Sequence, residues 1–101
     1  MTARLSFKGV IPPVVTPFSL DGDLDVEGLE KQLSWLSGRD LAGVLALGST
    51  GEAPLLDRAE RRKVIETAAA LKEEGRVLLA GTGSESTRQT ILLCRDAAEA
   101  G

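Results

Sequence analysis

A repeated order of segments is the sequence feature that most restricts the fold of this 101-residue chain. Residues 44–49 align with residues 77–82 after a shift of 33 positions, and Glu52 then falls on Glu85. An earlier β-branched run begins at Val10, 34 positions before Val44. The chain is therefore three strand–loop–helix units of nearly equal length. Strands that alternate with helices predict a parallel sheet with right-handed crossovers.

Three apolar runs are the predicted strands. Residues 9–15 contain two prolines, which cannot donate to a sheet, so we expect irregular or partial pairing there. Residues 42–47 are apolar at every position apart from glycine, which predicts a strand buried on both faces. Residues 76–80 predict the third strand.

Each strand is followed by a predicted helix with an N-cap residue. Asp25, Asp57 and Ser86 occupy these positions, and the last two begin capping boxes completed three residues later. Apolar residues at helical spacing predict the buried faces: Val26, Leu29, Leu33 and Leu36; Val64, Ile65, Ala68 and Leu71; and Ile91, Leu92, Cys94, Ala97 and Ala98. We also expect Trp35 to pack in the core. Basic residues of the second helix should form a solvated face: Arg58, Arg61, Arg62 and Lys63.

Composition excludes several classes of protein. The formal net charge of −3 and the absence of a basic patch argue against a nucleic-acid partner. No secretory h-region or membrane-length apolar run is visible, so we expect a cytoplasmic protein without a membrane partner. The chain has no histidine and one cysteine, Cys94, which we expect to be a small buried hydrophobe. The carboxylates near residue 21 resemble a calcium loop but lack its glycine and final glutamate, so we predict no metal site.

Residues 48–52, Gly-Ser-Thr-Gly-Glu, are the candidate binding loop. They directly follow the second predicted strand, where α/β proteins bind ligands. Gly48 and Gly51 permit left-handed or crowded backbone, and Ser49 and Thr50 add two hydroxyls. We predict a site for a small anion, most simply a carboxylate; a tight turn beside a helix cap is the alternative.

Residues 81–86 nearly match the dinucleotide-binding pattern but lack its third glycine. They also follow the third strand rather than the first, and no acidic residue ends a strand about 20 positions later. An open doubly wound sheet and a closed (β/α)8 barrel both fit the order of elements. The even repeat favours the barrel, which needs about 250 residues. The chain is therefore predicted to be the first part of a longer protein.

Three motifs, in residues 9–18, 48–52 and 79–83, resemble the N-terminal part of the dihydrodipicolinate synthase/N-acetylneuraminate lyase family. The resemblance covers essentially the whole chain. It implies a TIM (β/α)8 barrel whose first three βα units are residues 1–101, as the N-terminal portion of one domain. It also implies a homotetrameric lyase that uses a Schiff-base lysine and no metal or organic cofactor.

Site residues are carried over from the same resemblance. Thr50 would bind the substrate carboxylate together with N–H groups of Gly48 and Gly51, and Ser49 would be catalytic through a tyrosine proton relay. Thr82 would lie on the pocket rim. The Schiff-base lysine and the tyrosines fall beyond position 101 in the family, so these residues alone are expected to be inactive.

The resemblance implies pyruvate as one substrate and an aldehyde or imine as the other. Two branches of the family stay open, the dihydrodipicolinate synthase branch and the 4-hydroxy-2-oxoglutarate aldolase branch, as do other sugar-acid or 2-oxo-acid aldolases. Outside this class, a nucleotide-binding module and a non-catalytic relative are the remaining hypotheses.

Overall fold

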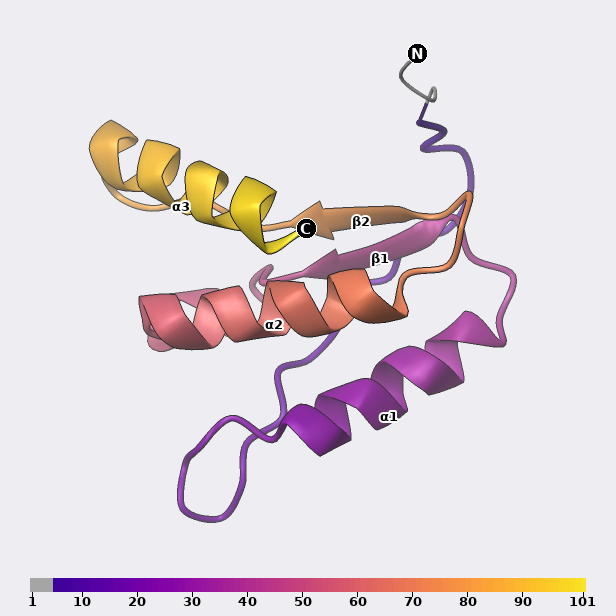
Figure 1. Ribbon diagram of the computed structural model, residues 1–101, viewed down its shortest axis with the longest axis horizontal. Coiled ribbons are helices and arrows are strands. Elements are labelled where there is room, and N and C mark those ends of the chain that lie inside the picture. The colour runs from indigo at the N-terminus through magenta and orange to yellow at the C-terminus, as the bar shows by residue number, and fades with distance from the viewer. Residues whose placement is uncertain (1–4) are drawn as a thin grey trace.

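A computed structural model describes residues 5–101 of the chain. The elements along the chain are α1 (Val26–Ser37), β1 (Gly43–Ala46), the 3-10 helix η1 (Ala53–Leu55), α2 (Arg58–Leu71), β2 (Val77–Ala80) and α3 (Thr87–Ala100). In Figure 1 the two strands lie side by side, and α2 lies between the other two helices. The predicted alternation of strands and helices is confirmed.

Strands β1 and β2 form a parallel pair, as the repeat predicted. Gly43 lies opposite Val77, and Ala46 lies opposite Ala80, so the two strands end at the same level. This register places the segments that follow the two strands at one edge of the sheet.

The first predicted strand, residues 9–15, which we call the first segment, runs beside β1 with little regular pairing. Pro13 forms an isolated parallel bridge with Leu45, and the Val14 N–H donates to the Leu45 carbonyl over 2.9 Å. The prediction of partial pairing is confirmed, because proline supplies no N–H for a continuous ladder. The resulting order of strands places the first segment, β1 and β2 in chain order across the sheet.

The core lies where α1 and α2 cover the strands. Its buried members come from the first segment, α1, β1, the stretch between β1 and α2, and α2: Val14, Leu29, Leu33, Ala46, Leu47, Ala53, Leu56, Val64, Ile65 and Ala68. Leu29 and Val64 are completely excluded from solvent. The predicted apolar faces of α1 and α2 are thus mostly confirmed, although Leu71, at the end of α2, is 40% exposed.

The predicted N-caps begin all three helices. The side chains of Asp25, Asp57 and Ser86 accept hydrogen bonds from the N–H groups three residues on. The capping box at Asp57 is complete, because the N3 glutamate accepts from the Asp57 N–H over 2.9 Å. The second predicted box is only half formed, since the Ser86 N–H donates to Ser84 Oγ instead. Within residues 5–101, none of the helices combines the length and apolar character needed to cross a membrane.

Trp35 and Cys94, both predicted to be buried, are exposed. Trp35 is 62% exposed, and the Arg39 guanidinium lies 4.0 Å from its ring centroid. Helix α1 directs Leu33 into the core, and two positions further along a helix a side chain faces nearly the opposite way. Cys94 is also exposed, and its thiol donates to Thr82 Oγ1 over 3.3 Å.

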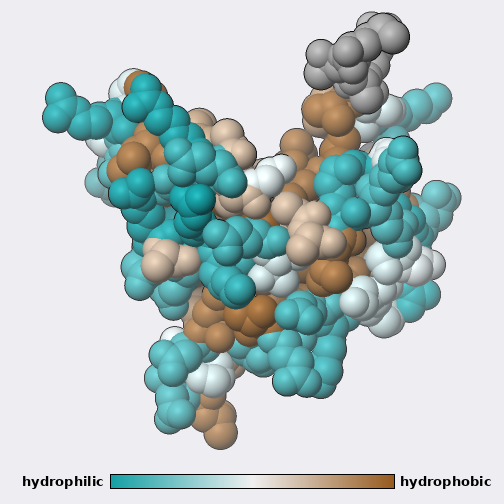
Figure 2. Space-filling model, in the orientation of Figure 1, coloured by the Kyte–Doolittle hydropathy of each residue, from teal (hydrophilic) through white to brown (hydrophobic). Residues whose placement is uncertain are grey.

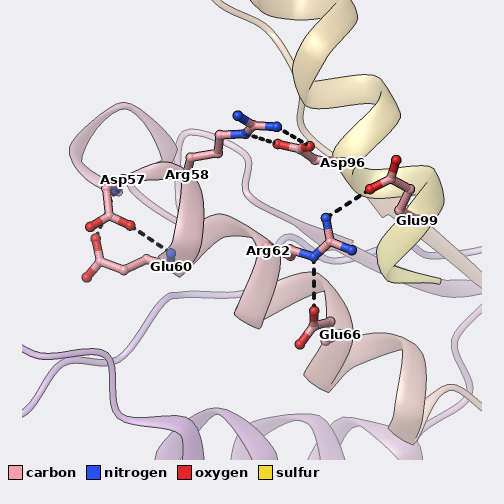
Figure 3. Close-up of polar contacts among 7 residues, drawn as sticks. All are labelled: Asp57, Arg58, Glu60, Arg62, Glu66, Asp96 and Glu99. Carbon is pink, nitrogen blue, oxygen red and sulfur yellow. Dashed lines mark hydrogen bonds and ion pairs between the residues drawn. The ribbon is translucent and has the colours of Figure 1, made fainter.

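The buried face of α3 differs from the predicted one. Leu93 and Asp96 are buried, whereas Ile91 is 47% exposed. Arg58 of α2 holds the Asp96 carboxylate with two hydrogen bonds, of 2.5 and 2.8 Å (Figure 3). These bonds lower the pKa of Asp96 below its ordinary value, against the opposing effect of its burial.

The basic residues of α2 are therefore not simply a solvated face. Arg62 donates hydrogen bonds to Glu66 on its own helix and to Glu99 on α3, as Figure 3 shows. With the Arg58 pair, these contacts join α2 to α3 through charged groups. A carboxylate can be buried on α3 because the guanidinium that neutralises it comes from the neighbouring helix.

Candidate functional site

The ends of three parallel segments meet at one edge of the sheet. Thr16 follows the first segment, residues 48–52 follow β1, and Thr82 follows β2. We call residues 48–52 the site loop. Since all three segments run in the same direction, their carboxyl ends bring these hydroxyl-bearing residues together at one edge.

The site loop is a compact turn with free donors. The Gly51 N–H, which we expected to help bind the carboxylate, donates to the Gly48 carbonyl over 3.1 Å. The Glu52 N–H donates to the Ser49 carbonyl over 3.0 Å. Among residues 5–101, the N–H groups of Ser49 and Thr50 donate to no protein acceptor. Both residues are exposed, so two N–H groups and two hydroxyls remain available to a ligand.

Two residues other than glycine adopt the left-handed backbone of this region. Leu47 has φ of 60° and Glu52 has φ of 55°, whereas Gly48 and Gly51 stay outside the left-handed region. Non-glycine residues in that region carry strain of the order of 1 kcal/mol or more, and such strain concentrates at functional sites. Contacts with neighbouring residues therefore hold Leu47, just before the site loop, and Glu52, at its end, in the left-handed conformation.

Crowding explains Gly51. A Cβ atom there would lie 3.2 Å from the Val14 carbonyl oxygen and 3.3 Å from the Leu47 nitrogen. These distances are tighter than most real Cβ contacts, so glycine lets the site loop pack against the first segment. The expectation of crowded backbone is confirmed at this position.

Thr16 is a residue of this region that sequence reasoning missed. Its side chain is buried, and its hydroxyl donates to the Gly51 carbonyl over 2.6 Å. The signal was present, because a threonine directly follows an apolar run at a position equivalent to the hydroxyls after the other strands.

The side chains of Thr82 and Glu52 differ in burial and hydrogen bonding from the exposed hydroxyls of Ser49 and Thr50. Thr82 is half-buried and accepts the hydrogen bond from the thiol of Cys94, so α3 holds its side chain. The carboxylate of Glu52 is exposed and makes no hydrogen bond or ion pair within residues 5–101. Residues 5–101 also bring together no group of three or more side chains suited to holding a metal ion.

Lysines in the described part of the chain lie away from this edge. Lys31 pairs with Glu27 on α1, Lys63 is on α2, and Lys72 is the C-cap of α2. Lys8 precedes the first segment. An amine that reacts with a ligand in the site loop would therefore have to come from other sequence.

Parallel strands joined by helices, with glycine and hydroxyl residues after each strand, define the class as a parallel α/β fold. A sequence model described as the dihydrodipicolinate synthetase family matches residues 6–101. The chain belongs to this family. Its fold is therefore a portion of a TIM (β/α)8 barrel.

Similar proteins include two curated relatives and a solved structure. A 4-hydroxy-tetrahydrodipicolinate synthase of Methanothrix thermoacetophila is 41% identical over 94% of this chain and 32% of its own length. A probable mitochondrial 4-hydroxy-2-oxoglutarate aldolase of Emericella nidulans is 42% identical over the whole chain and 34% of its own. A crystal structure of dihydrodipicolinate synthase from Aquifex aeolicus superposes with a TM-score of 0.86 at 34% identity, covering 94% of this chain and 32% of that one. The chain thus spans about a third of the length of these relatives.

Proposed function

We propose that the complete protein containing this chain is a Schiff-base lyase or aldolase that acts on pyruvate. The observation that carries the proposal is the site loop, where two exposed hydroxyls and two free N–H groups lie at the carboxyl ends of parallel strands. Such an array suits a carboxylate, because each donor can bond one of its oxygens. Family membership supports the same reading.

The proposed chemistry gives the site loop a positioning task. A lysine amine from later sequence attacks the 2-oxo carbonyl of pyruvate, and water leaves to give an iminium. The iminium accepts the electron pair when a C3–H or C3–C4 bond breaks, and the resulting enamine donates that pair when a new bond to C3 forms. Thr50 Oγ1 and the free N–H groups hold the carboxylate, so that the carbonyl carbon faces the amine. Ser49 contributes its hydroxyl to a proton relay with tyrosines that also come from later sequence.

The surface supports the proposal that residues 1–101 are the N-terminal portion of one larger domain. Within residues 5–101, β2 pairs on one side only. Beside it lies an apolar groove bounded by Leu5, Phe7 and Ala97, and Figure 2 shows a notch with apolar surface. Further βα units of the barrel would cover this groove. From the family resemblance, and not from this groove, we expect the complete protein to be a cytoplasmic homotetramer and residues 1–101 alone to be inactive.

The synthase reaction is our main assignment, and the 4-hydroxy-2-oxoglutarate aldolase reaction is the alternative. The similar proteins include a 4-hydroxy-tetrahydrodipicolinate synthase and a probable 4-hydroxy-2-oxoglutarate aldolase, which supports considering both reactions. A simple assay distinguishes the two reactions, because the aldolase cleaves the C3–C4 bond of 4-hydroxy-2-oxoglutarate to give pyruvate and glyoxylate. Release of pyruvate from that compound would favour the alternative.

Borohydride trapping with pyruvate tests the proposal. The complete protein should gain the mass of one reduced pyruvate on a single lysine beyond position 101. At low pyruvate concentration, Thr50→Val should slow trapping about tenfold or more, because a donor to a charged group is lost. Thr67→Val is the matched control, since Thr67 donates to the Lys63 carbonyl inside α2. Absence of any adduct would refute the proposal and leave a non-catalytic or nucleotide-binding relative.

A further inference from the structure

The Thr16 hydroxyl makes the one side-chain hydrogen bond to the site loop within residues 5–101. It donates to the Gly51 carbonyl over 2.6 Å, and Thr16 itself is 4% exposed. The Gly51 N–H is bound as well, to the Gly48 carbonyl. Gly51, the residue after Thr50, is therefore held through its N–H by the turn itself and through its carbonyl by Thr16.

Thr16 has a fixed position because hydrogen bonds to α1 and its N-cap hold the backbone of the residues on either side of it. The Gln32 side chain of α1 accepts from the Val15 N–H and donates to the Val15 carbonyl, each over 3.0 Å. On the other side, the Pro17 carbonyl accepts from the Asp25 N–H over 2.9 Å. The backbone that carries Thr16 is thus tied to both the start and the middle of α1.

From this geometry we propose that Thr16 is a positioning residue for carboxylate binding. It does not touch the ligand; it acts through Gly51 to keep Ser49 and Thr50 at the strand ends. The inference rests on the proposed function, because it names a task within the same site. Without the hydroxyl, the Gly51 carbonyl loses its buried partner, and the turn can move away from the crowded contact with the first segment.

Steady-state kinetics with pyruvate, measured on three variants of the complete protein, test whether Thr16 positions the site loop. Thr16→Val keeps the shape of the side chain and removes the donor, whereas Thr16→Ser keeps the donor. Thr67→Val removes a hydroxyl that also donates to a backbone carbonyl, but does so inside α2. We expect Thr16→Val to raise KM for pyruvate about tenfold with a much smaller change in kcat, because uniform binding is lost. Thr16→Ser should restore KM to within about threefold of the wild type.

Hydrogen exchange provides a measurement that does not depend on activity. Amides in a peptide covering residues 47–53 should exchange faster in Thr16→Val than in either Thr16→Ser or Thr67→Val. Equal exchange and equal KM in Thr16→Val and Thr67→Val would overturn the inference. If the wild type forms no pyruvate adduct, the proposed function fails instead, and the exchange data alone decide whether Thr16 positions the loop.

Discussion

Gly81→Ala offers a sharp test of how the strands position the site loop. A Cβ atom at Gly81 would lie 1.9 Å from the carbonyl oxygen of Leu47, the residue that directly precedes the loop. The Gly81 N–H also donates to the Ala46 carbonyl over 2.8 Å. The methyl group therefore cannot be accommodated unless the end of β1 and the end of β2 separate.

The size of the effect follows from these distances. Real Cβ contacts essentially never fall under 3.0 Å, so the two segments must move apart by about 1 Å or more. Overpacking of this kind costs about 1–3 kcal/mol, and loss of the Gly81–Ala46 hydrogen bond adds about 1 kcal/mol. A displacement of about 1 Å in a positioned site can also lower a rate constant about 100-fold.

Two matched variants separate stability from site geometry. Gly43→Ala meets the Val77 carbonyl oxygen at the same 1.9 Å, but at the opposite end of the β1–β2 pair. Gly83→Ala lies two residues after Gly81 and meets nothing within 4 Å. We expect the first two variants to be destabilised by similar amounts and Gly83→Ala to unfold like the wild type.

Denaturant unfolding and pyruvate kinetics of the complete protein provide the readouts. Gly43→Ala should lower the unfolding midpoint while KM for pyruvate stays close to the wild-type value. Gly81→Ala should lower the midpoint and impair pyruvate binding or turnover as well. Equal kinetic losses in both variants would refute the placement of the site at the carboxyl ends of the strands.

Two further predictions concern the helices. The pKa of Asp96 is lowered by its hydrogen bonds from Arg58, so its stabilising contribution is present above the ordinary pKa near 4 and is lost as the pH falls toward the lower folded-state value. Asp96→Asn should therefore be less stable at pH 7 and show a weaker loss of unfolding free energy between about pH 5 and pH 3; an unchanged acid profile would contradict this pairing. Asp57→Ala should lower the unfolding free energy by about 1 kcal/mol through loss of the capping box, whereas Asp21→Ala, in an exposed turn, should change it by less than about 0.5 kcal/mol.

Local signals in the sequence predicted most of the fold. The N-caps at Asp25, Asp57 and Ser86 are each made by a side chain and an N–H three residues on, so a short stretch of sequence suffices to predict them. The 33-residue repeat predicted the parallel strands and placed the site loop after β1. The irregular pairing of the first segment likewise follows from its own prolines.

Long-range contacts account for what the sequence did not reveal. The buried Asp96 pairs with Arg58, which lies 38 residues earlier on α2, so the spacing of apolar residues within α3 could not reveal this contact. The left-handed φ values at Leu47 and Glu52 depend on packing around the turn rather than on residue type. The hydrogen bond from Thr16 reaches Gly51, 35 residues away, so the sequence offered only the presence of the Thr16 hydroxyl.

A crystal structure of the complete protein with pyruvate bound tests the central proposal most directly. The account predicts that the pyruvate carboxylate lies within hydrogen-bond distance of Thr50 Oγ1 and of the N–H groups of Ser49 and Thr50. The 2-oxo carbon should be bonded to, or facing, a lysine from outside residues 1–101. A carboxylate bound elsewhere, with these hydroxyls turned away from it, would contradict the proposal.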